Sequence, residues 1–460
     1  MADRFHNITE GSIPRQVVRL AWPAVLAMLL RTALTITDAF WVGHVGKAEM
    51  AAVISSMFVL WTFFSIFDIV WIGSVAVIAR FYGARNFDLV GHSARQAIVL
   101  GSAAAVVMMI VGYITVRWLF HVMETAANVT DMGTMYLRIV FAVTIPLVLG
   151  ELFSAMFRAS GDTRTPLMIS ASATVFNIVL DPMLIFGVGP FPKLGVAGAA
   201  LATAIAYLLA FTLYLIAIKR GRLTFKFSWP KYTGPDLRMM WQMIKIGSPL
   251  ATAGVVFSVA YLFMNKIVSS FGTEANAALG IGNRCESISY LVCFGFSIAV
   301  STLVGQNLGA GKPDRAAKSV WYALLYTGVF TAVISIAFLT IPRLIASGFV
   351  PEPEVIDIAA SYLMILALSQ SFMAIEIVME GAFSGAGYTW PAMLVSVVGS
   401  VARVPLAYYF SFGLDAGVSG VFWSITLTTI VKGIVLLIWF SRGTWKHKEI
   451  HGGAAEASLA

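Results

Sequence analysis

Long apolar stretches separated by short polar segments dominate the chain. A transmembrane helix needs about 20 mostly apolar residues, and twelve stretches reach that length. They lie near 17–42, 51–79, 93–120, 133–157, 165–188, 195–218, 242–271, 276–308, 317–343, 356–384, 388–412 and 417–441. Each is expected to be helical, since backbone exposed to lipid must satisfy its own hydrogen bonds. The pattern therefore predicts an all-α polytopic membrane protein with twelve transmembrane helices.

The two halves of the chain repeat at one constant offset, the step along the sequence from Gly46 to Gly272, which we call the repeat offset. The matching positions are Gly46 and Gly272, Ala51-Ala52 and Ala277-Ala278, Gly83-Ala84 and Gly309-Ala310, Asp88 and Asp314, Phe157 and Phe383, Gly161 and Gly387, and Thr163 and Thr389. Six spans in each repeat is an even number, so the halves should share one orientation and be related by a pseudo-two-fold axis along the membrane normal.

This repeat predicts the domain organisation. We expect an amino-terminal six-helix lobe at 1–218, a cytoplasmic linker at 219–240, a carboxy-terminal six-helix lobe at 241–443 and a cytoplasmic tail at 444–460. A monomer is the expectation.

Composition and charge agree with a membrane protein. Hydrophobic residues make up 59% of the 460 residues and charged residues 12%, whereas soluble domains are about 25% charged. The formal charge of +8 does not predict nucleic-acid binding, because the basic residues lie in short loops between spans. The central loop holds Lys219, Arg220, Arg222, Lys226, Lys231 and Arg238, and the outer loops hold only Lys47, Lys193 and Arg343. This asymmetry predicts a multi-pass protein of the inner membrane with both termini cytoplasmic.

Ionisable groups inside a membrane are costly, so each is a functional candidate. Asp38 lies deep in the first span, seven residues after Arg31 and on the same helical face. Pro23, earlier in this span, can bend the helix. A structural Arg31–Asp38 pair is the alternative to a role for Asp38 in transport.

Asn177 and Asp181 are four residues apart in the fifth span, so they share a helical face. Pro182 follows, and its missing N–H frees the carbonyl of Ile178. These oxygens suit a small hard cation, and the hydroxyl of Thr203 in the sixth span is a further candidate ligand. The alternative is an asparagine that joins helices and an aspartate that pairs with Arg138.

Other embedded acids have no single assignment from sequence. They are Asp68, Glu151, Glu286, Glu376 and Glu380, and the bases Arg403 and Lys432 are candidate partners. A structural ion pair is at least as good an explanation for each as a role in transport. Two buried carboxylates close together, such as Asp38 and Asp181, would instead bind a proton or Na⁺ to relieve their like charge.

No enzyme motif is present, so we expect neither catalysis nor a cofactor. The chain contains no P-loop, H-E-x-x-H or G-x-S-x-G motif. Uphill transport would therefore need an ion gradient. The 20 methionines and the aromatic residues fit lipid-facing and packing positions, and some suit a cavity for an apolar substrate.

Several motifs resemble those of the multidrug and toxic compound extrusion (MATE) transporters, and the likeness covers nearly the whole chain. They are Thr37-Asp38-Ala39-Phe40-Trp41-Val42-Gly43-His44-Val45-Gly46, Gly161-Asp162-Thr163-Arg164-Thr165-Pro166, Asn177-Ile178-Val179-Leu180-Asp181-Pro182 and Gly195-Val196-Ala197-Gly198-Ala199-Ala200-Leu201-Ala202-Thr203. The resemblance implies two six-helix lobes arranged in a V around a cavity. It also implies an antiporter that exports amphiphilic compounds by alternating access while Na⁺ or H⁺ enters.

The resemblance also implies roles for single residues. It assigns a cation site to Asp38, Asn177, Asp181 and Thr203, as in the DinF-like branch, with Na⁺ as a candidate metal. It assigns the bend of the first helix to Pro23 and cavity-lining positions to Met28 and Tyr136. The acid that the NorM-like branch carries in the seventh span is replaced here by apolar residues near Phe257. Arg31 departs from the uncharged polar residue expected at its cavity position. A fixed positive charge there would either favour zwitterionic or anionic substrates or hold Asp38 in its charged form.

Three functions are compatible with these features. The leading one is a cation-coupled exporter of amphiphilic, mostly cationic compounds. The second is a lipid or lipid-linked oligosaccharide flippase of the same superfamily, which would need a more basic cavity than the scattered embedded bases provide. The third is a membrane-embedded enzyme or receptor, which would need a catalytic cluster or a large soluble domain.

Overall fold

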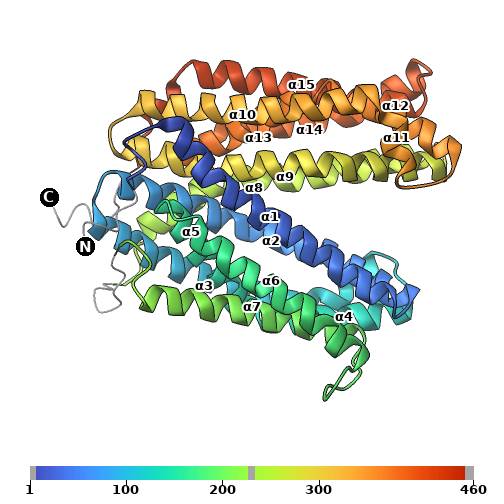
Figure 1. Cartoon of the computed structure of the whole chain (residues 1–460), viewed down its shortest axis with the longest axis horizontal. Helices are drawn as coiled ribbons and strands as arrows, with labels where there is room; N and C mark the ends of the chain where they lie inside the picture. The colour runs from blue at the N-terminus through green and yellow to red at the C-terminus, as the bar shows by residue number, and fades with distance from the viewer. Residues whose placement is uncertain (1–6, 226–233, 451–460) are drawn as a thin grey trace. The chain divides into compact units, whose positions relative to one another are not determined.

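The computed structural model describes residues 7–225 and 234–450, and over this part of the chain the secondary structure is helical. The linker residues Lys226 and Lys231, counted above as topology signals, lie outside the described residues. Contacts divide the chain into two compact units (Figure 1). The amino-terminal unit is built on Leu26–Gly247, and the carboxy-terminal unit on Thr9–Val25 together with Ser248–Glu449.

Helices of the first half of the chain are long and apolar. They are α1 (Ile13–Gly43), α2 (Lys47–Gly83), α3 (Phe87–Val122), α4 (Ala127–Ala142), α5 (Thr144–Ala159), α6 (Arg164–Phe186) and α7 (Val196–Lys219). Those of the second half are α8 (Leu237–Ser269), α9 (Thr273–Gly309), α10 (Pro313–Thr340), α11 (Pro342–Ser347), α12 (Pro353–Ala367), α13 (Gln370–Gly385), α14 (Trp390–Tyr408) and α15 (Val418–Ser441). A π-helical turn (Tyr409–Gly413) follows α14 and a 3-10 turn (Thr444–His447) follows α15.

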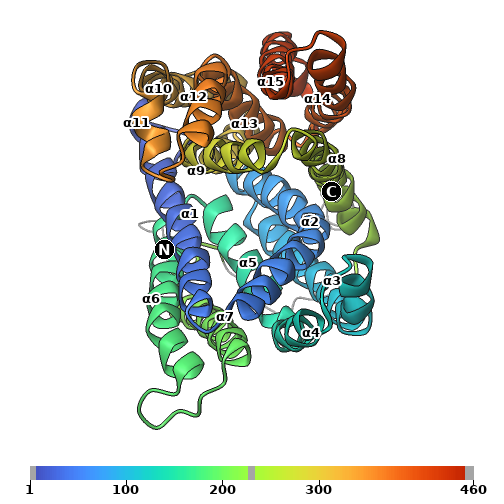
Figure 2. The same cartoon turned by 90° about the vertical axis from the view of Figure 1, so that its right-hand side faces the viewer.

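The predicted repeat is visible in the helix starts. Helices α2 and α9 begin one repeat offset apart, and the same offset relates α3 to α10, α4 to α12, α5 to α13 and α6 to α14. The neighbour relations repeat as well: α2 packs on α3 and α5 as α9 packs on α10 and α13. Figure 2 shows α14 beside α15, the counterpart of α6 beside α7. Each unit therefore has its own copy of one helical arrangement.

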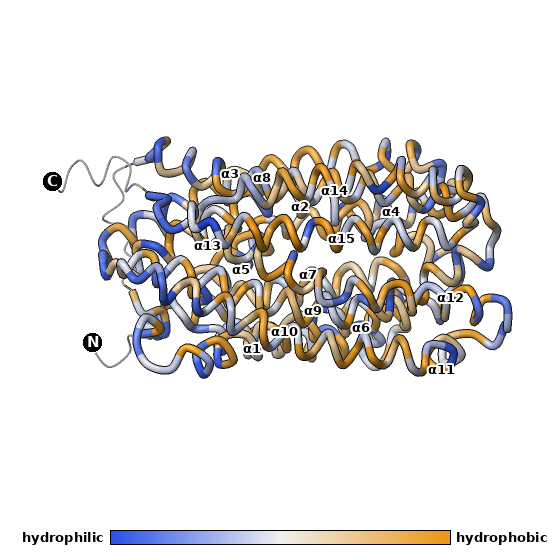
Figure 3. The backbone as a smooth tube through the Cα atoms, turned by 90° about the horizontal axis from the view of Figure 1, so that it is seen from above, coloured by the Kyte–Doolittle hydropathy of each residue, from blue (hydrophilic) through white to orange (hydrophobic). Residues whose placement is uncertain are grey.

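Two of the twelve predicted spans are not continuous helices. The span expected at 133–157 consists of α4 and α5, which meet at a bend of 56°, and the span expected at 356–384 consists of α12 and α13 with the same bend. Ten further helices are each long and apolar enough to cross a membrane, so the described residues offer ten spans, or twelve with the bent pairs. Figure 3 shows apolar residues along the middle of the long helices and hydrophilic ones near their ends.

Two helices pass from one compact unit to the other. In α1 the unit boundary falls between Val25 and Leu26, two residues after Pro23. In α8 it falls between Gly247 and Ser248, just before Pro249. Because Pro23 and Pro249 are one repeat offset apart, these crossings are equivalent points of the repeat, and each has a helix-interior proline that removes one backbone hydrogen bond.

Side chains of α3 hold the start of α8 in place. The Gln96 side chain donates to the carbonyl of Gly234 (2.9 Å) and accepts from the N–H of Asp236 (3.0 Å). His92 Nε2 lies 3.1 Å from Asp236 Oδ2. The other Asp236 oxygen accepts from the N–H groups of Arg238 and Met239, which caps α8 at its first turn.

Candidate cation site

Three helices of the amino-terminal unit bring the predicted cation ligands together. Asp38 comes from α1, Asn177 and Asp181 from α6, and Thr203 from α7. Thr203 donates to Asp38 Oδ2 at 3.4 Å, and the Asn177 amide donates to Asp181 Oδ1 at 3.4 Å. The spacing of four residues in α6 thus places the amide and the carboxylate on one face, as the sequence predicts.

The cluster is enclosed, and three of its oxygens lack a hydrogen-bond donor. Asp38 is 3% exposed, while Asn177 and Asp181 are fully buried. Asp38 Oδ1, Asn177 Oδ1 and Asp181 Oδ2 have no hydrogen-bond partner among the residues that the structure describes. A buried polar atom without a partner is costly, so three such oxygens in one cluster are suited to a ligand that accepts oxygen lone pairs.

The carboxyl groups of Asp38 and Asp181 lie within hydrogen-bonding reach of each other. Two ionised carboxylates in this position would repel strongly, because little water is present to screen them. Either one proton shared by the pair or a small cation between them removes the repulsion. Carboxylate, amide and hydroxyl oxygens are ligands that hard cations accept, so the residues present fit Na⁺ as well as H⁺.

Local sequence explains why α6 presents these side chains. Gly161 adopts a φ of 89°, which turns the chain after α5. Asp162 then accepts from the N–H groups of Arg164 and Thr165, both at 3.0 Å, and from the Thr165 hydroxyl at 2.6 Å. These bonds satisfy the first turn of α6. Pro182 follows Asp181 inside the helix and supplies no N–H to it.

Tyr136 of α4, predicted to line the substrate cavity, lies against the cation cluster. It is 3% exposed, and it interacts electrostatically with Asp38 and Asp181. Met28 of α1 is half-buried, and its carbonyl accepts a 3.1 Å bond from Thr32. Tyr136 was missed as a neighbour of the cation site because α4 and α7 are far apart in sequence.

Arg31 does not pair with Asp38. Its Nη1 lies 3.7 Å from Glu151 Oε1 of α5, and its guanidinium carbon lies 5.9 Å from the centre of the Phe64 ring. The alternative of an Arg138–Asp181 pair is also wrong, because Arg138 lies over the Tyr113 ring, 4.9 Å from its centre. Neither Arg31 nor Arg138 therefore neutralises an aspartate of the cluster.

Comparison with known proteins decides the family. The MatE family profile matches residues 23–183 and again residues 249–409. The chain belongs to the MatE family. The two matches start at Pro23 and Pro249 and are separated by the repeat offset, which confirms the repeat predicted from sequence.

Relatives of this MatE chain include transporters with different named cargo. It is 27% identical over 440 residues to a probable multidrug resistance protein NorM of Thermotoga maritima, covering 95% of this chain and 94% of that protein. It is also 27% identical to an FAD transporter of Shewanella oneidensis, covering 94% and 95%. A crystal structure of the Vibrio cholerae MATE transporter VcmN in the bent form superimposes with a TM-score of 0.87 at 21% identity, covering 94% of this chain and 96% of that one.

The carboxy-terminal unit of the MatE chain has a different set of buried charges. Lys432 of α15 forms an ion pair with Glu376 of α13, and both side chains are largely buried. The Ser396 hydroxyl of α14 lies 3.0 Å from Glu380 and 3.4 Å from Glu376. The structure therefore settles one pairing that the sequence left open.

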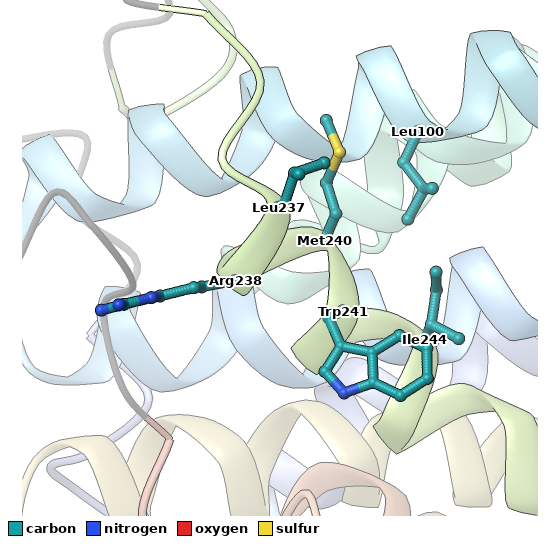
Figure 4. Close-up of a pocket in the computed structure, with 6 residues that line it drawn as sticks. All are labelled: Leu100, Leu237, Arg238, Met240, Trp241 and Ile244. Carbon is teal, nitrogen blue, oxygen red and sulfur yellow. The ribbon is translucent and has the colours of Figure 1, made fainter.

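An apolar groove lies between α3 and α8 in the amino-terminal unit. It encloses about 510 Å³ and is lined by Leu100, Leu237, Arg238, Met240, Trp241 and Ile244. Figure 4 shows Trp241 and Ile244 at its wall, while Arg238 points away from Leu100. The groove shares no residue with the cation cluster.

Proposed function

We propose that this MatE chain is a secondary active exporter that couples the uptake of Na⁺ or H⁺ to the export of amphiphilic organic compounds by alternating access. It acts in the inner membrane with both termini in the cytoplasm, as the distribution of Lys and Arg predicts. A further part of this proposal is that the chain works as a monomer and needs no cofactor beyond the coupling ion.

The contact between Asp38 and Asp181 is the observation that carries the proposal. The two buried carboxyl groups and the Asn177 amide leave three oxygens without donors, and a proton or a small cation satisfies them. Binding removes one unit of negative charge from the cluster. Asp38 lies in α1, so we expect the loss of charge at the cluster to move this helix. Pro23 lies near the unit boundary in α1 and is the point where the helix would bend. Pro182 gives α6 a second point of bending beside Asp181.

A second substrate class is supported by the charges near α1 and by one relative. Arg31 is 55% exposed at its side chain, and Glu151 is 36% exposed, and we infer that both charges meet the substrate. A relative of similar identity is named as an FAD transporter, and FAD is an anion. Anionic or zwitterionic compounds are therefore the second candidate. The flippase alternative is not favoured, because the named relatives are multidrug and FAD transporters.

Reconstitution tests the proposal. The purified chain in liposomes is given a fluorescent cationic dye or FAD, first under a Na⁺ gradient and then under a pH gradient. We expect one gradient to drive movement of one of the two compounds and Asp38→Asn to abolish it. Asp131→Asn is the matched control, because Asp131 is an exposed acid paired with Arg117. Movement that is equal in Asp38→Asn and the unaltered chain would refute the proposed coupling.

A further inference from the structure

The repeat assigns every ligand of the cation cluster a counterpart in the carboxy-terminal unit. At the repeat offset shared by both profile matches, Asp38 corresponds to Met264, Asn177 to Arg403 and Asp181 to Ala407. Helices α6 and α14 start at Arg164 and Trp390, which are separated by the same offset. The matching starts of α6 and α14 therefore fix which residues of the two helices correspond.

The counterpart of Thr203 follows from the last helix of each unit. Gly195 and Gly417 precede α7 and α15 with φ angles of 56° and 57°, and each begins a Gly-Val-x-Gly segment. Aligning the two helices on these glycines pairs Thr203 with Ile425. Met264, Ala407 and Ile425 all belong to one buried hydrophobic cluster. Three of the four cation ligands have therefore been replaced by packed apolar side chains.

The fourth position carries a positive charge. Arg403 is 6% exposed, its Nε donates to Thr428 Oγ1 at 3.0 Å, and its Nη2 donates to Thr429 Oγ1 at 3.2 Å. Its guanidinium carbon also lies 5.9 Å from the centre of the Phe257 ring. Hydroxyl oxygens and an aromatic ring are surroundings that stabilise a cation, and here the chain itself provides that cation.

We propose that Arg403 is an internal cation that permanently takes the place, in the carboxy-terminal unit, of the exchangeable ion bound by Asp38 and Asp181. This inference rests on the proposed function. Arginine stays charged in proteins, so its charge cannot leave during the transport cycle. A second cation would be repelled from this position. The transporter then takes up its coupling ion in the amino-terminal unit alone.

Lys432 is a second buried cation of the carboxy-terminal unit that has no charged counterpart in the amino-terminal unit. Its ammonium group pairs with Glu376, and its methylene stem lies against Gly399 of α14, where any Cβ would collide with it. Gly399 is one helical turn before Arg403, so α14 accommodates both cations on one face. The amino-terminal counterparts of Gly399 and Lys432 are Ala173 and Ala210. Both fixed cations are therefore features of the carboxy-terminal unit.

The acids around these cations also have no acidic counterpart. Glu376 corresponds to Gly150, Glu380 to Ser154 and Glu286 to Leu60. Arg403 interacts electrostatically with Glu376 and Glu286. We infer from this arrangement that the carboxy-terminal acids are countered by Arg403 and Lys432 throughout the cycle rather than by an ion that comes and goes.

Chemical rescue tests the role of Arg403. Arg403→Ala is expected to lower gradient-driven export at least about tenfold, whereas Arg403→Lys, which keeps the charge but not the planar guanidinium, is expected to lower it less. Guanidinium ions added at millimolar concentration should restore Arg403→Ala and leave Asp38→Asn inactive. Arg343→Ala is the control, because Arg343 is exposed in a surface pair with Asp357 of the same unit. Wild-type export by folded Arg403→Ala without guanidinium, or no rescue of the folded variant, would overturn the proposal.

Counting bound ions on the unaltered chain keeps the proposal testable even if Arg403→Ala does not fold. Radioactive Na⁺ binding and proton uptake are measured at equilibrium on purified protein. One ion per chain that disappears in Asp38→Asn is expected. A second ion that survives in Asp38→Asn refutes the internal-cation proposal but leaves the proposed function standing. Binding of neither ion refutes the proposed function, and this inference with it.

Discussion

The carboxyl groups of Asp38 in α1 and Asp181 in α6 lie within hydrogen-bonding reach of each other. Thr203 and Asn177 each donate to one of them, and this leaves three oxygens of the cluster without a donor. An arrangement of this kind is stable only with a proton or a cation present.

Replacing Asp181 with asparagine should separate stability from function. The change removes one of two like charges that repel, so we expect a midpoint of thermal unfolding equal to or above that of the unaltered chain. Gradient-driven export should fall at least about tenfold, because one charged ligand of the coupling ion is lost. Thermal unfolding in detergent and export from liposomes measure the two effects. A destabilised variant that still exports at full rate would contradict this account.

Removing either partner of the Glu376–Lys432 ion pair should lower the stability of the fold. Removing one partner leaves a buried charge uncompensated, which typically costs about 3–5 kcal/mol. We therefore expect a clear loss of thermal stability in Glu376→Gln and in Lys432→Met, measured by the unfolding midpoint.

The double variant Glu376→Gln/Lys432→Met provides the control for this pair. Because both charges are removed together, it should be more stable than either single variant. A double variant whose loss equals the sum of the two single losses would show that the ion pair seen between α13 and α15 contributes no coupling energy.

Substrate charge preference should change when the Arg31–Glu151 pair is altered. Glu151→Gln leaves a net positive charge beside Phe64, so export of FAD relative to a cationic dye should rise about three- to tenfold. Arg31→Gln should shift the ratio in the opposite direction by a similar factor. Competition between the two compounds in liposomes measures the ratio. A ratio that stays unchanged in both variants would exclude this pair from substrate selection.

Pro23 should affect turnover more than binding. It lies two residues before the point where α1 passes from one unit to the other, so Pro23→Ala restores a helical hydrogen bond at a candidate hinge. We expect export to slow about three- to tenfold with substrate affinity unchanged. Pro249→Ala, at the equivalent point of α8, shows whether the second crossing also bends. Equal export rates in Pro23→Ala and the unaltered chain would exclude a hinge at Pro23.

Much of the cation cluster could be predicted from sequence because its geometry is local. Asn177 and Asp181 are one helical turn apart, and an acid such as Asp38 in an apolar span is visible in any reading of the chain. The contribution of Tyr136 and the pairing of Arg31 with Glu151 depend on how different helices pack. No pattern in a single helix contains that information.

The two bent spans show the same limit in backbone terms. For α4 and α5 a local signal exists, because Pro146 has no N–H for the carbonyl of Ala142, where the break occurs. At the break between α12 and α13 two carbonyls accept from hydroxyls of other helices: Ile365 accepts from Thr426 at 3.2 Å, and Ala367 accepts from Ser335 at 2.8 Å. Those donors come from other helices, so the local sequence of α12 and α13 does not predict this bend.

The most direct test of the central claim is the release of the coupling ion when substrate binds. Substrate is added to the purified chain in weakly buffered detergent solution, and released protons and Na⁺ are recorded together. We predict that one ion is released per chain and that Asp38→Asn and Asp181→Asn release none, because the contact between these two residues holds the ion. Release of the same amount from both variants would contradict the assignment of the coupling ion to this pair.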